Sequence, residues 1–199
     1  MISDARAREI LFAVQPGMSI PKRQAIQAIG RFEGNYGAAF GGANNWGAVQ
    51  CGHVAPCREG CVQTPDTHAD GTQYQGCFRA YPDLEAGAAD LVRLLDIHFA
   101  VPADVLNGGN ADAIASGMRN PPKASPSHGF GYFEAPIDRY AKAIASNAGA
   151  IATNLGEPLY VLREADLAQQ PALPGEGGGG TLTTLGAIAA LALLGGFIG

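Results

Sequence analysis

Glu33 is the residue whose type and position are best suited to chemistry. It lies four residues after Ile29 and seven after Ile26, so on a helix the three side chains share one face. The carboxyl group is thus placed on an apolar face, at the end of a helix that Gly34 would terminate. Partial burial and the negative end of the helix dipole would both raise its pKa. A carboxylic acid protonated near neutral pH can protonate a leaving oxygen, the general-acid step of glycoside cleavage. The competing interpretation is an ordinary solvated glutamate at a helix end.

Four short segments, in order, resemble motifs of lysozyme-like enzymes that degrade peptidoglycan, the bacterial and phage glucosaminidases of the flagellar and autolysin type. Residues 33–37 resemble a Glu-Ser-x-x-Gly catalytic signature, and residues 44–47 resemble an Asn-Asn-hydrophobic-Gly segment. Residues 78–82 and the helix after them are similar to a Phe-Arg-x-Tyr element. Residues 131–134, ahead of a last helix, are similar to a late tyrosine motif. The resemblance covers roughly residues 20–148.

The resemblance implies a peptidoglycan-cleaving glycosidase with Glu33 as proton donor and with Tyr132 lining the cleft or assisting the reaction. It also implies a set of residues that shape the site or bind the glycan strand: Tyr36, Asn44, Asn45, Trp46 and Glu134. Trp46 could instead be a core aromatic residue, and Tyr132 a packed ring with a satisfied hydroxyl. Two other functions stay open: a lytic transglycosylase acting on the same substrate, and a non-catalytic virion protein that keeps the fold.

The second catalytic group is not identified by the sequence. Most glycosidases use two carboxylates, and the candidates are Glu59, Asp66, Asp70 and Glu134. A transglycosylase or a substrate-assisted reaction would need only Glu33. We expect no metal or cofactor at the catalytic site.

Four cysteines, Cys51, Cys57, Cys61 and Cys77, lie in a loop over residues 51–77 that is atypical of the family. Four closely spaced cysteines suggest two disulfides with three possible pairings. The spacing of Cys57 and Cys61, with His53 nearby, keeps a structural zinc site as the alternative. Disulfides are the favoured prediction.

The elements that would position these groups are mainly helices. Pro21 suits the first turn of a helix that ends at Gly34, and Asp83 is a plausible N-cap of another. Residues 41–76 are rich in Gly, Pro, Asn and Asp and are expected to form a long irregular loop. The predicted fold is mainly α, in the α+β lysozyme-like class, with helices over residues 5–14, 21–34, 83–99, 111–118 and a last one carrying Ile137, Tyr140, Ile144 and Ala148.

Composition divides the 199 residues into three parts. Residues 1–160 would form the catalytic domain, and residues 161–180, with their prolines and a glycine run, a flexible linker. Residues 181–199 carry no charge and have about the length that spans a bilayer, which predicts a C-terminal hydrophobic anchor helix. A helix buried in a particle is the alternative. The net charge of -5, with scattered basic residues, argues against a nucleic-acid partner.

These features lead to an expectation about where the protein acts. The first residues are interrupted by charges before an apolar stretch can form, so they do not resemble a secretory signal. A wall-degrading enzyme without such a signal fits a phage virion-associated lysin that acts on the cell wall at infection, with residues 181–199 held in a membrane or virion assembly. A bacterial protein exported by another route is the alternative.

Deleting everything after Leu173 should give a soluble, active domain, because the predicted motifs and periodic helices all precede that residue. The full chain should need detergent, lipid or an assembly partner, since an uncharged segment of this length would expose a large apolar surface. Gel filtration and activity of the two proteins check this. An insoluble truncated form beside a soluble, monomeric full chain would show that the tail belongs to the domain core.

Overall fold

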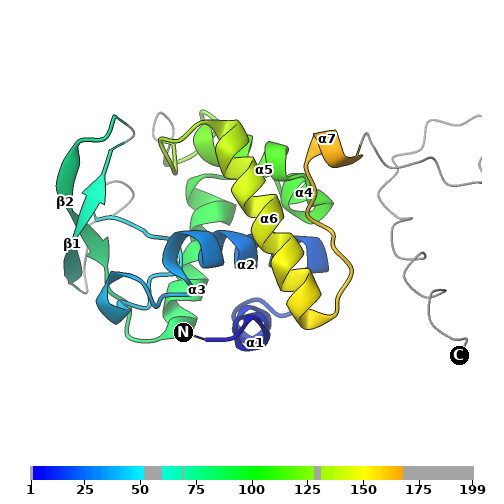
Figure 1. The fold of residues 1–199 in the computed structure, drawn as a ribbon, viewed down its shortest axis with the longest axis horizontal. Helices are drawn as coiled ribbons and strands as arrows, with labels where there is room; N and C mark the ends of the chain where they lie inside the picture. Colours follow the sequence, from blue (N-terminus) through cyan, green and yellow to red (C-terminus); the bar gives the residue numbers. More distant parts are fainter. Residues whose placement is uncertain (1, 52–59, 69, 128–130, 168–199) are drawn as a thin grey trace, which may run out of the picture.

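The computed structural model describes residues 2–51, 60–68, 70–127 and 131–167. A body of helices is flanked on one side by a two-stranded antiparallel sheet (Figure 1). This agrees with the predicted mainly α, α+β class. The helices are α1 (Asp4–Val14), α2 (Ile20–Gly34), α3 (Leu84–Arg93), α4 (Ala103–Gly108), α5 (Ala111–Arg119), α6 (Ile137–Leu155) and α7 (Glu164–Leu167), with a 3-10 turn at Phe40–Gly42 and a π-helical turn at Leu94–His98, and the strands are β1 (Cys61–Thr67) and β2 (Gln73–Arg79).

Helix α2 lies at the centre of the body and packs against α1, α3, α4 and α6. It begins where the Ser19 hydroxyl accepts a hydrogen bond from the backbone N–H of Lys22, with Pro21 in the first turn as predicted. It ends at Gly34, and the C-cap residue Asn35 has a left-handed conformation (φ 47°), which asparagine tolerates. Every residue from Lys22 to Gly30 is buried, so the helix is enclosed on nearly all sides.

The polar side chains of α2 are buried together with their partners. Arg23 donates hydrogen bonds to Gln27 and to Glu157 beyond the end of α6. Gln24 donates to the carbonyl of Pro158 at 2.8 Å and accepts from the N–H of Tyr160 at 2.9 Å. A buried polar group without partners is strongly unfavourable, so these contacts hold the segment after α6 against α2 in one register.

The C-terminal end of α2 meets the segment after it at unusually short range. A Cβ atom on Gly34 would lie 2.1 Å from the carbonyl oxygen of Asn45 and 2.7 Å from that of Trp46. A Cβ on Gly30 would lie 2.8 Å from the Trp46 ring, which is fully buried. Glycine at both positions lets the backbone around Trp46 close over the end of the helix that carries Glu33.

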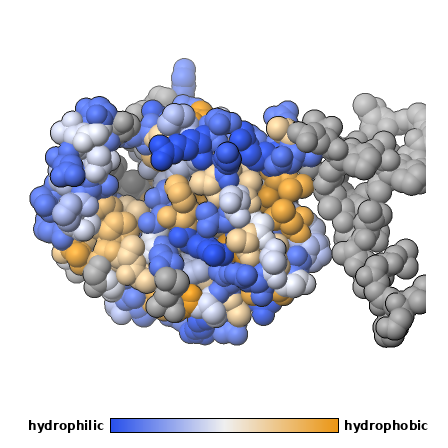
Figure 2. Space-filling model, viewed as in Figure 1, coloured by the Kyte–Doolittle hydropathy of each residue, from blue (hydrophilic) through white to orange (hydrophobic). Residues whose placement is uncertain are grey.

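Residues 61–67 and 73–76 lie in the two strands of a β-hairpin, so the predicted irregular loop is wrong there. Strand β1 pairs with β2 from Cys61 opposite Arg79 to Thr67 opposite Gln73. The upper part of the hairpin is mainly hydrophilic (Figure 2), and β1, with the sequence CVQTPDT, lacks the apolar alternation that identifies a strand in a sequence. Pro65 in β1 is a further signal against a strand, tolerated where no neighbouring strand needs its N–H.

The cysteines stabilise this hairpin. Cys61 and Cys77 form a disulfide between the two strands, and Cys51 is also disulfide-bonded. The disulfide prediction is therefore confirmed for the bridge between Cys61 and Cys77, whereas Cys57 and Glu59 lie outside the described residues. The sulfur atoms of Cys51, Cys61 and Cys77 lie within 4.8 Å of one another. Because a metal ligand must be a thiolate, sulfurs in disulfides do not serve the zinc alternative.

The predicted helices match the observed positions closely, and two helices were not predicted, α4 and α7, the second of which lies in the predicted linker. Asp83 caps α3 through the N–H of Ala86, but the last turn of the predicted helix over 83–99 is π-helical. The folded part also continues past residue 160: Val161 is fully buried and Leu162 pairs with Gly109 and Ala111. The predicted anchor over 181–199 lies outside the described residues. Among the residues that are described, no helix has the length and apolar character to cross a bilayer.

The double variant Cys61→Ser/Cys77→Ser should lower the free energy of unfolding by about 3 kcal/mol, the contribution expected of a bridge that closes a loop of this size. The loop here has a sequence separation of 16. Denaturant unfolding followed by circular dichroism measures the change. A metal chelator should leave the wild-type midpoint unchanged, and a midpoint sensitive to chelator but indifferent to reductant would contradict the disulfide assignment.

Candidate active site

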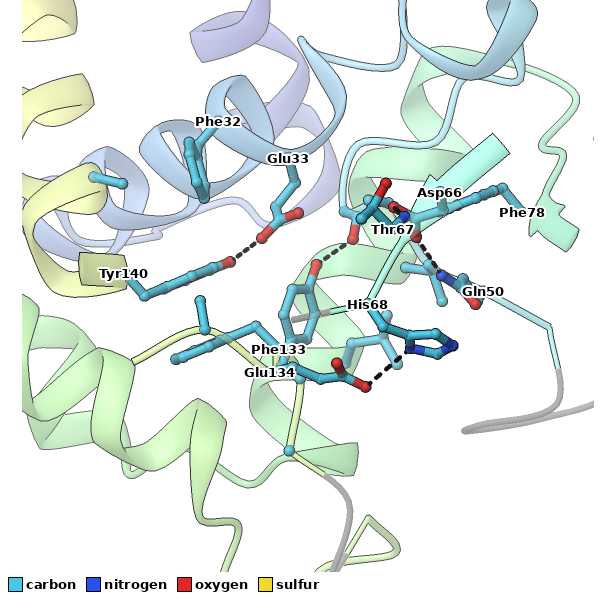
Figure 3. Close-up of a pocket in the computed structure, with 18 of the residues that line it drawn as sticks. Phe32, Glu33, Gln50, Asp66, Thr67, His68, Phe78, Phe133, Glu134 and Tyr140 are labelled. Carbon is cyan, nitrogen blue, oxygen red and sulfur yellow. Dashed lines mark hydrogen bonds and ion pairs between the residues drawn. The ribbon is translucent and has the colours of Figure 1, made fainter. Parts of the chain in front are cut away.

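Glu33 lies in the last turn of α2, where its carboxyl group faces Tyr140 of α6 (Figure 3). The hydroxyl of Tyr140 donates a hydrogen bond to Oε1 of Glu33. Burial raises the pKa of Glu33 from 4.5 to about 7, the Tyr140 hydrogen bond acts in the opposite direction, and the charge of Asp66 raises it further. Glu33 is therefore protonated in a large fraction of molecules at neutral pH, which is the state of a general acid.

Tyr140 is fixed by aromatic neighbours on both sides. Its ring stacks on Phe133, with centroids 3.7 Å apart and an interplanar angle of 2°, and meets Phe32 edge-on at 5.4 Å. Burial raises the pKa of Tyr140 well above its ordinary value, so the phenol stays neutral and remains a donor. The periodicity of α6 placed Tyr140 on the buried face, but no feature of the sequence indicated its contact with Glu33.

A cleft of about 830 Å³ separates the helical wall, formed by α2 and α6, from the hairpin. This volume lies within the ordinary range of ligand-binding sites. Figure 3 shows Glu33 on one side of the cleft, and Asp66 and His68 on the other. The lining includes Phe32, Glu33, Gly47, Gln50, Asp66, His68, Tyr132, Phe133, Glu134, Arg139 and Tyr140.

Asp66 is the candidate second carboxylate that the structure places opposite Glu33. Its Oδ2 accepts hydrogen bonds from Nε2 of Gln50 at 2.9 Å and from the hydroxyl of Tyr74 at 2.6 Å. Its Oδ1 accepts from the N–H of Thr67 at 2.8 Å. These donors fix the carboxyl group on the cleft side of β1.

Glu134, expected to bind substrate or to serve as the second carboxylate, lies at the cleft rim. Its carboxylate is 3.6 Å from Nδ1 of His68, and 63% of its side chain is exposed. His68 in turn stacks on Tyr74, with centroids 4.2 Å apart. The pair therefore connects the hairpin to the loop before α6 across the cleft. Asp70 is exposed in the hairpin turn and is not part of the cleft lining.

Tyr132 lines the cleft, where the sequence placed it. Its ring packs edge-on against Phe99 at 5.1 Å, and its hydroxyl donates to the carbonyl of Gly47. Burial raises the pKa of Tyr132 well above its ordinary value. With this hydroxyl already donated to the backbone, Tyr132 supports the cleft wall, and its assistance in the reaction stays a prediction.

The other residues expected to bind substrate lie behind the wall rather than in the lining. Trp46 and Asn45 are fully buried, and Tyr36 is 2% exposed. Asn45 donates to the carbonyls of Val49 and Arg79 and accepts from the N–H of Val49. Tyr36 and Asn44 also bind protein groups: the Tyr36 hydroxyl donates to Asp4 at 2.7 Å and the Asn44 amide to the carbonyl of Tyr81 at 3.0 Å. These four residues hold the segment that supports Gly47 and the start of the hairpin.

Comparison with known proteins places the fold. No protein-family model matches the chain, and a comparison with curated proteins gives no match. The structure is similar to a C-terminally truncated glycoside hydrolase domain from Salmonella typhimurium FlgJ, with 18% identity over 75% of this chain and 95% of that chain and a TM-score of 0.50. A peptidoglycan hydrolase mutant from Sphingomonas sp. A1 aligns over 77% of this chain and 92% of that chain, with 19% identity and a TM-score of 0.49. The chain thus has the fold of the Salmonella domain, as the resemblance in its sequence led us to expect.

Tyr140→Phe should move the basic limb of the pH–activity profile to higher pH. The hydroxyl stabilises the ionised form of Glu33, so removing it raises a pKa that is already about 7. A shift of roughly one pH unit corresponds to about 1.4 kcal/mol, the scale of a hydrogen bond to a charged group. The rate at low pH should fall as well, because the acid loses its orientation.

Tyr81→Phe is the matched control. Its hydroxyl donates to Asp90, and Tyr81 is not among the residues that line the cleft. Its pH profile should overlay that of the wild type. Equal profiles for Tyr140→Phe and the wild type would disprove the coupling between Tyr140 and Glu33.

Proposed function

We propose that this protein is a glycosidase that cleaves the glycan backbone of peptidoglycan, with Glu33 as the general acid. The observation that carries the proposal is a partly buried carboxyl group, with a pKa of about 7, that faces an open cleft opposite a second carboxylate. Perturbed carboxyl groups in clefts are typical of catalytic sites. The similarity of the fold to a glycoside hydrolase domain supports the same function.

In this proposal the two oxygens of Glu33 have different tasks. Tyr140 donates to Oε1, so in the protonated acid the proton is carried by Oε2 and is available to the glycosidic oxygen. Transfer of that proton breaks the bond to the leaving sugar as positive charge develops on the other. The Tyr140 hydrogen bond then stabilises the carboxylate that remains.

Asp66 is the second group in our proposed mechanism. Its carboxylate, held by Gln50, Tyr74 and the backbone of Thr67, would stabilise the developing positive charge and accept a proton from water. This favours hydrolysis over a transglycosylase that uses Glu33 alone. Glu134 is less suited to the role, because it lies at the rim and pairs with His68.

The substrate class rests on the sequence resemblance together with the fold. The glycan strand would lie between the hairpin and α6, and the protein would act at the bacterial cell wall. The virion-associated route, with residues 181–199 as a membrane or assembly anchor, rests on the sequence alone. We retain it as the proposed means of delivery.

Glu33→Gln should reduce kcat on purified peptidoglycan by about 10²–10⁴-fold, the usual contribution of a general acid. Glutamine keeps the shape and can still accept the Tyr140 hydrogen bond, but it has no proton to transfer. Glu85→Gln is the control, because Glu85 is exposed and pairs with Arg6 outside the cleft. Wild-type activity in the Glu33→Gln protein would disprove the role of Glu33, whereas a wild-type protein without activity would favour the non-catalytic interpretation. Mass analysis of the products identifies the bond and separates hydrolysis from anhydro-sugar formation.

The same variant should be more stable than the wild type at high pH. Folding raises the pKa of Glu33 from 4.5 to about 7, so it favours the protonated form. The resulting stabilisation is complete below about pH 4.5 and is lost as the pH rises through about 7. Above that pH the neutral glutamine removes the ionised group, and thermal unfolding should occur at a higher temperature than in the wild type. This result also shows that the variant is folded.

A further inference from the structure

Arg139 differs from most arginines of this protein in its surroundings. It is exposed, it lines the cleft, and within the described part of the chain none of the ion pairs or side-chain hydrogen bonds involves it. Other arginines are paired with carboxylates, namely Arg6, Arg8, Arg23, Arg31, Arg79, Arg93 and Arg163. Its guanidinium group is thus free to bind a ligand.

The position of Arg139 is set by the helix that carries it. Residues 136, 139, 140 and 143 of this segment all line the cleft, which is the spacing of one helical face. Tyr140 is held against Glu33, and the preceding Asp138 is bound by Arg163 at 2.6 Å. The backbone of Arg139 is therefore fixed on both sides, one residue from the side chain that orients the proposed acid.

Phe32 lies on the same wall and is unusually exposed for a large apolar residue. Its side chain precedes Glu33 on α2, its ring meets Tyr140 edge-on, and the residue is 46% exposed. An exposed ring in a cleft that Arg139 also lines offers a ligand both an apolar surface and a charged group. The wall next to Glu33 is therefore suited to a ligand that has both characters.

The charged groups that line the cleft indicate the chemical character of this ligand. Glu33, Asp66 and Glu134 are carboxyl groups of the lining, and His68 is already engaged with Glu134. An anionic substrate would be repelled by such a lining unless a cation compensates its charge. Arginine is suited to this task, because its planar group binds a carboxylate through two parallel hydrogen bonds.

We propose that Phe32 and Arg139 form a subsite for the acidic side chain of the muramic acid sugar, with the ring of Phe32 against the sugar and the guanidinium of Arg139 on a carboxylate. This rests on the proposed peptidoglycan substrate and deepens it. The carboxylate belongs to the stem peptide where one is attached, or to the lactyl group where the peptide has been removed, because the amide bond to the peptide uses the lactyl carboxyl group. The subsite distinguishes peptidoglycan from neutral polymers of N-acetylglucosamine, which have no such group.

Binding in a Glu33→Gln background tests the proposal without turnover. Three ligands of equal sugar length are compared by calorimetry: a peptide-bearing peptidoglycan fragment, the same fragment after amidase removal of its peptides, and a chito-oligosaccharide. Adding Arg139→Gln should weaken binding of a carboxylate-bearing fragment about tenfold, which corresponds to about 1.4 kcal/mol. Binding of the chito-oligosaccharide should stay within twofold.

The pattern of loss identifies the carboxylate. A loss confined to the peptide-bearing fragment assigns the contact to a stem-peptide carboxylate, and a loss confined to the amidase-treated fragment assigns it to the lactyl carboxylate. A loss with both fragments shows that Arg139 binds either carboxylate. Arg139→Lys should retain part of the affinity, because it keeps the charge but not the paired hydrogen bonds. Lys142→Gln, an exposed cation on the same helix outside the cleft lining, is the matched control and should change none of the three affinities.

The ring of Phe32 is tested in the same assay. Phe32→Ala should weaken all three ligands, and Phe32→Trp should restore them, whereas Phe12→Ala, at an exposed phenylalanine of α1, should have no effect. Equal losses for all ligands on Arg139→Gln, or no loss for any, would overturn the proposal. Either result would leave the proposed function standing if Glu33 remains essential for wall cleavage. Binding of no ligand by the parent would instead contradict the proposed function itself.

Discussion

The hydrogen bond from Tyr140 to Glu33 is the interaction around which the cleft is organised. It joins the end of α2 to the first turns of α6, two helices that pack along the centre of the body. Burial makes the ionised form of Glu33 unfavourable, and the phenol offsets part of that effect. The balance leaves the carboxyl group near the midpoint of its titration at neutral pH, where it can both donate a proton and exist as the base that remains.

This arrangement requires α2 to be rigid, and its burial provides that rigidity. Arg23 and Gln24, polar residues in the middle of the helix, are bound by the segment after α6. Gly34 allows the backbone of Asn45 and Trp46 to cover the end of the helix. The cover is maintained by the fully buried Asn45, whose amide joins Val49 to Arg79 at the base of the hairpin. Residues that the sequence suggested for substrate binding thus support the wall from behind.

The two walls of the cleft are stabilised by different means. The helical wall is held by apolar packing, whereas the hairpin is stabilised by a disulfide, by backbone pairing, and by polar contacts of Gln50, Tyr74 and His68. A small hairpin has little apolar surface to bury, so cross-links replace the missing core. The polar contacts also determine where the carboxylate of Asp66 lies, so stability and the geometry of the site depend on the same residues.

The features that could be predicted from the sequence are those that depend on interactions between residues close together along the chain. Apolar spacing placed Glu33 on the face of its helix, and Pro21 and the Asp83 cap act within a few residues of themselves, so helix positions could be predicted. The hairpin could not be predicted, because its polar strands are stabilised by pairing and a disulfide rather than by alternation. The partner of Glu33 could not be predicted either: Tyr140 is 107 residues away, and its ring has the same spacing as the core residues of α6. Which side chains face the cleft was decided only when α2, α6 and the hairpin packed together, because such contacts depend on the relative orientation of elements that no local pattern encodes.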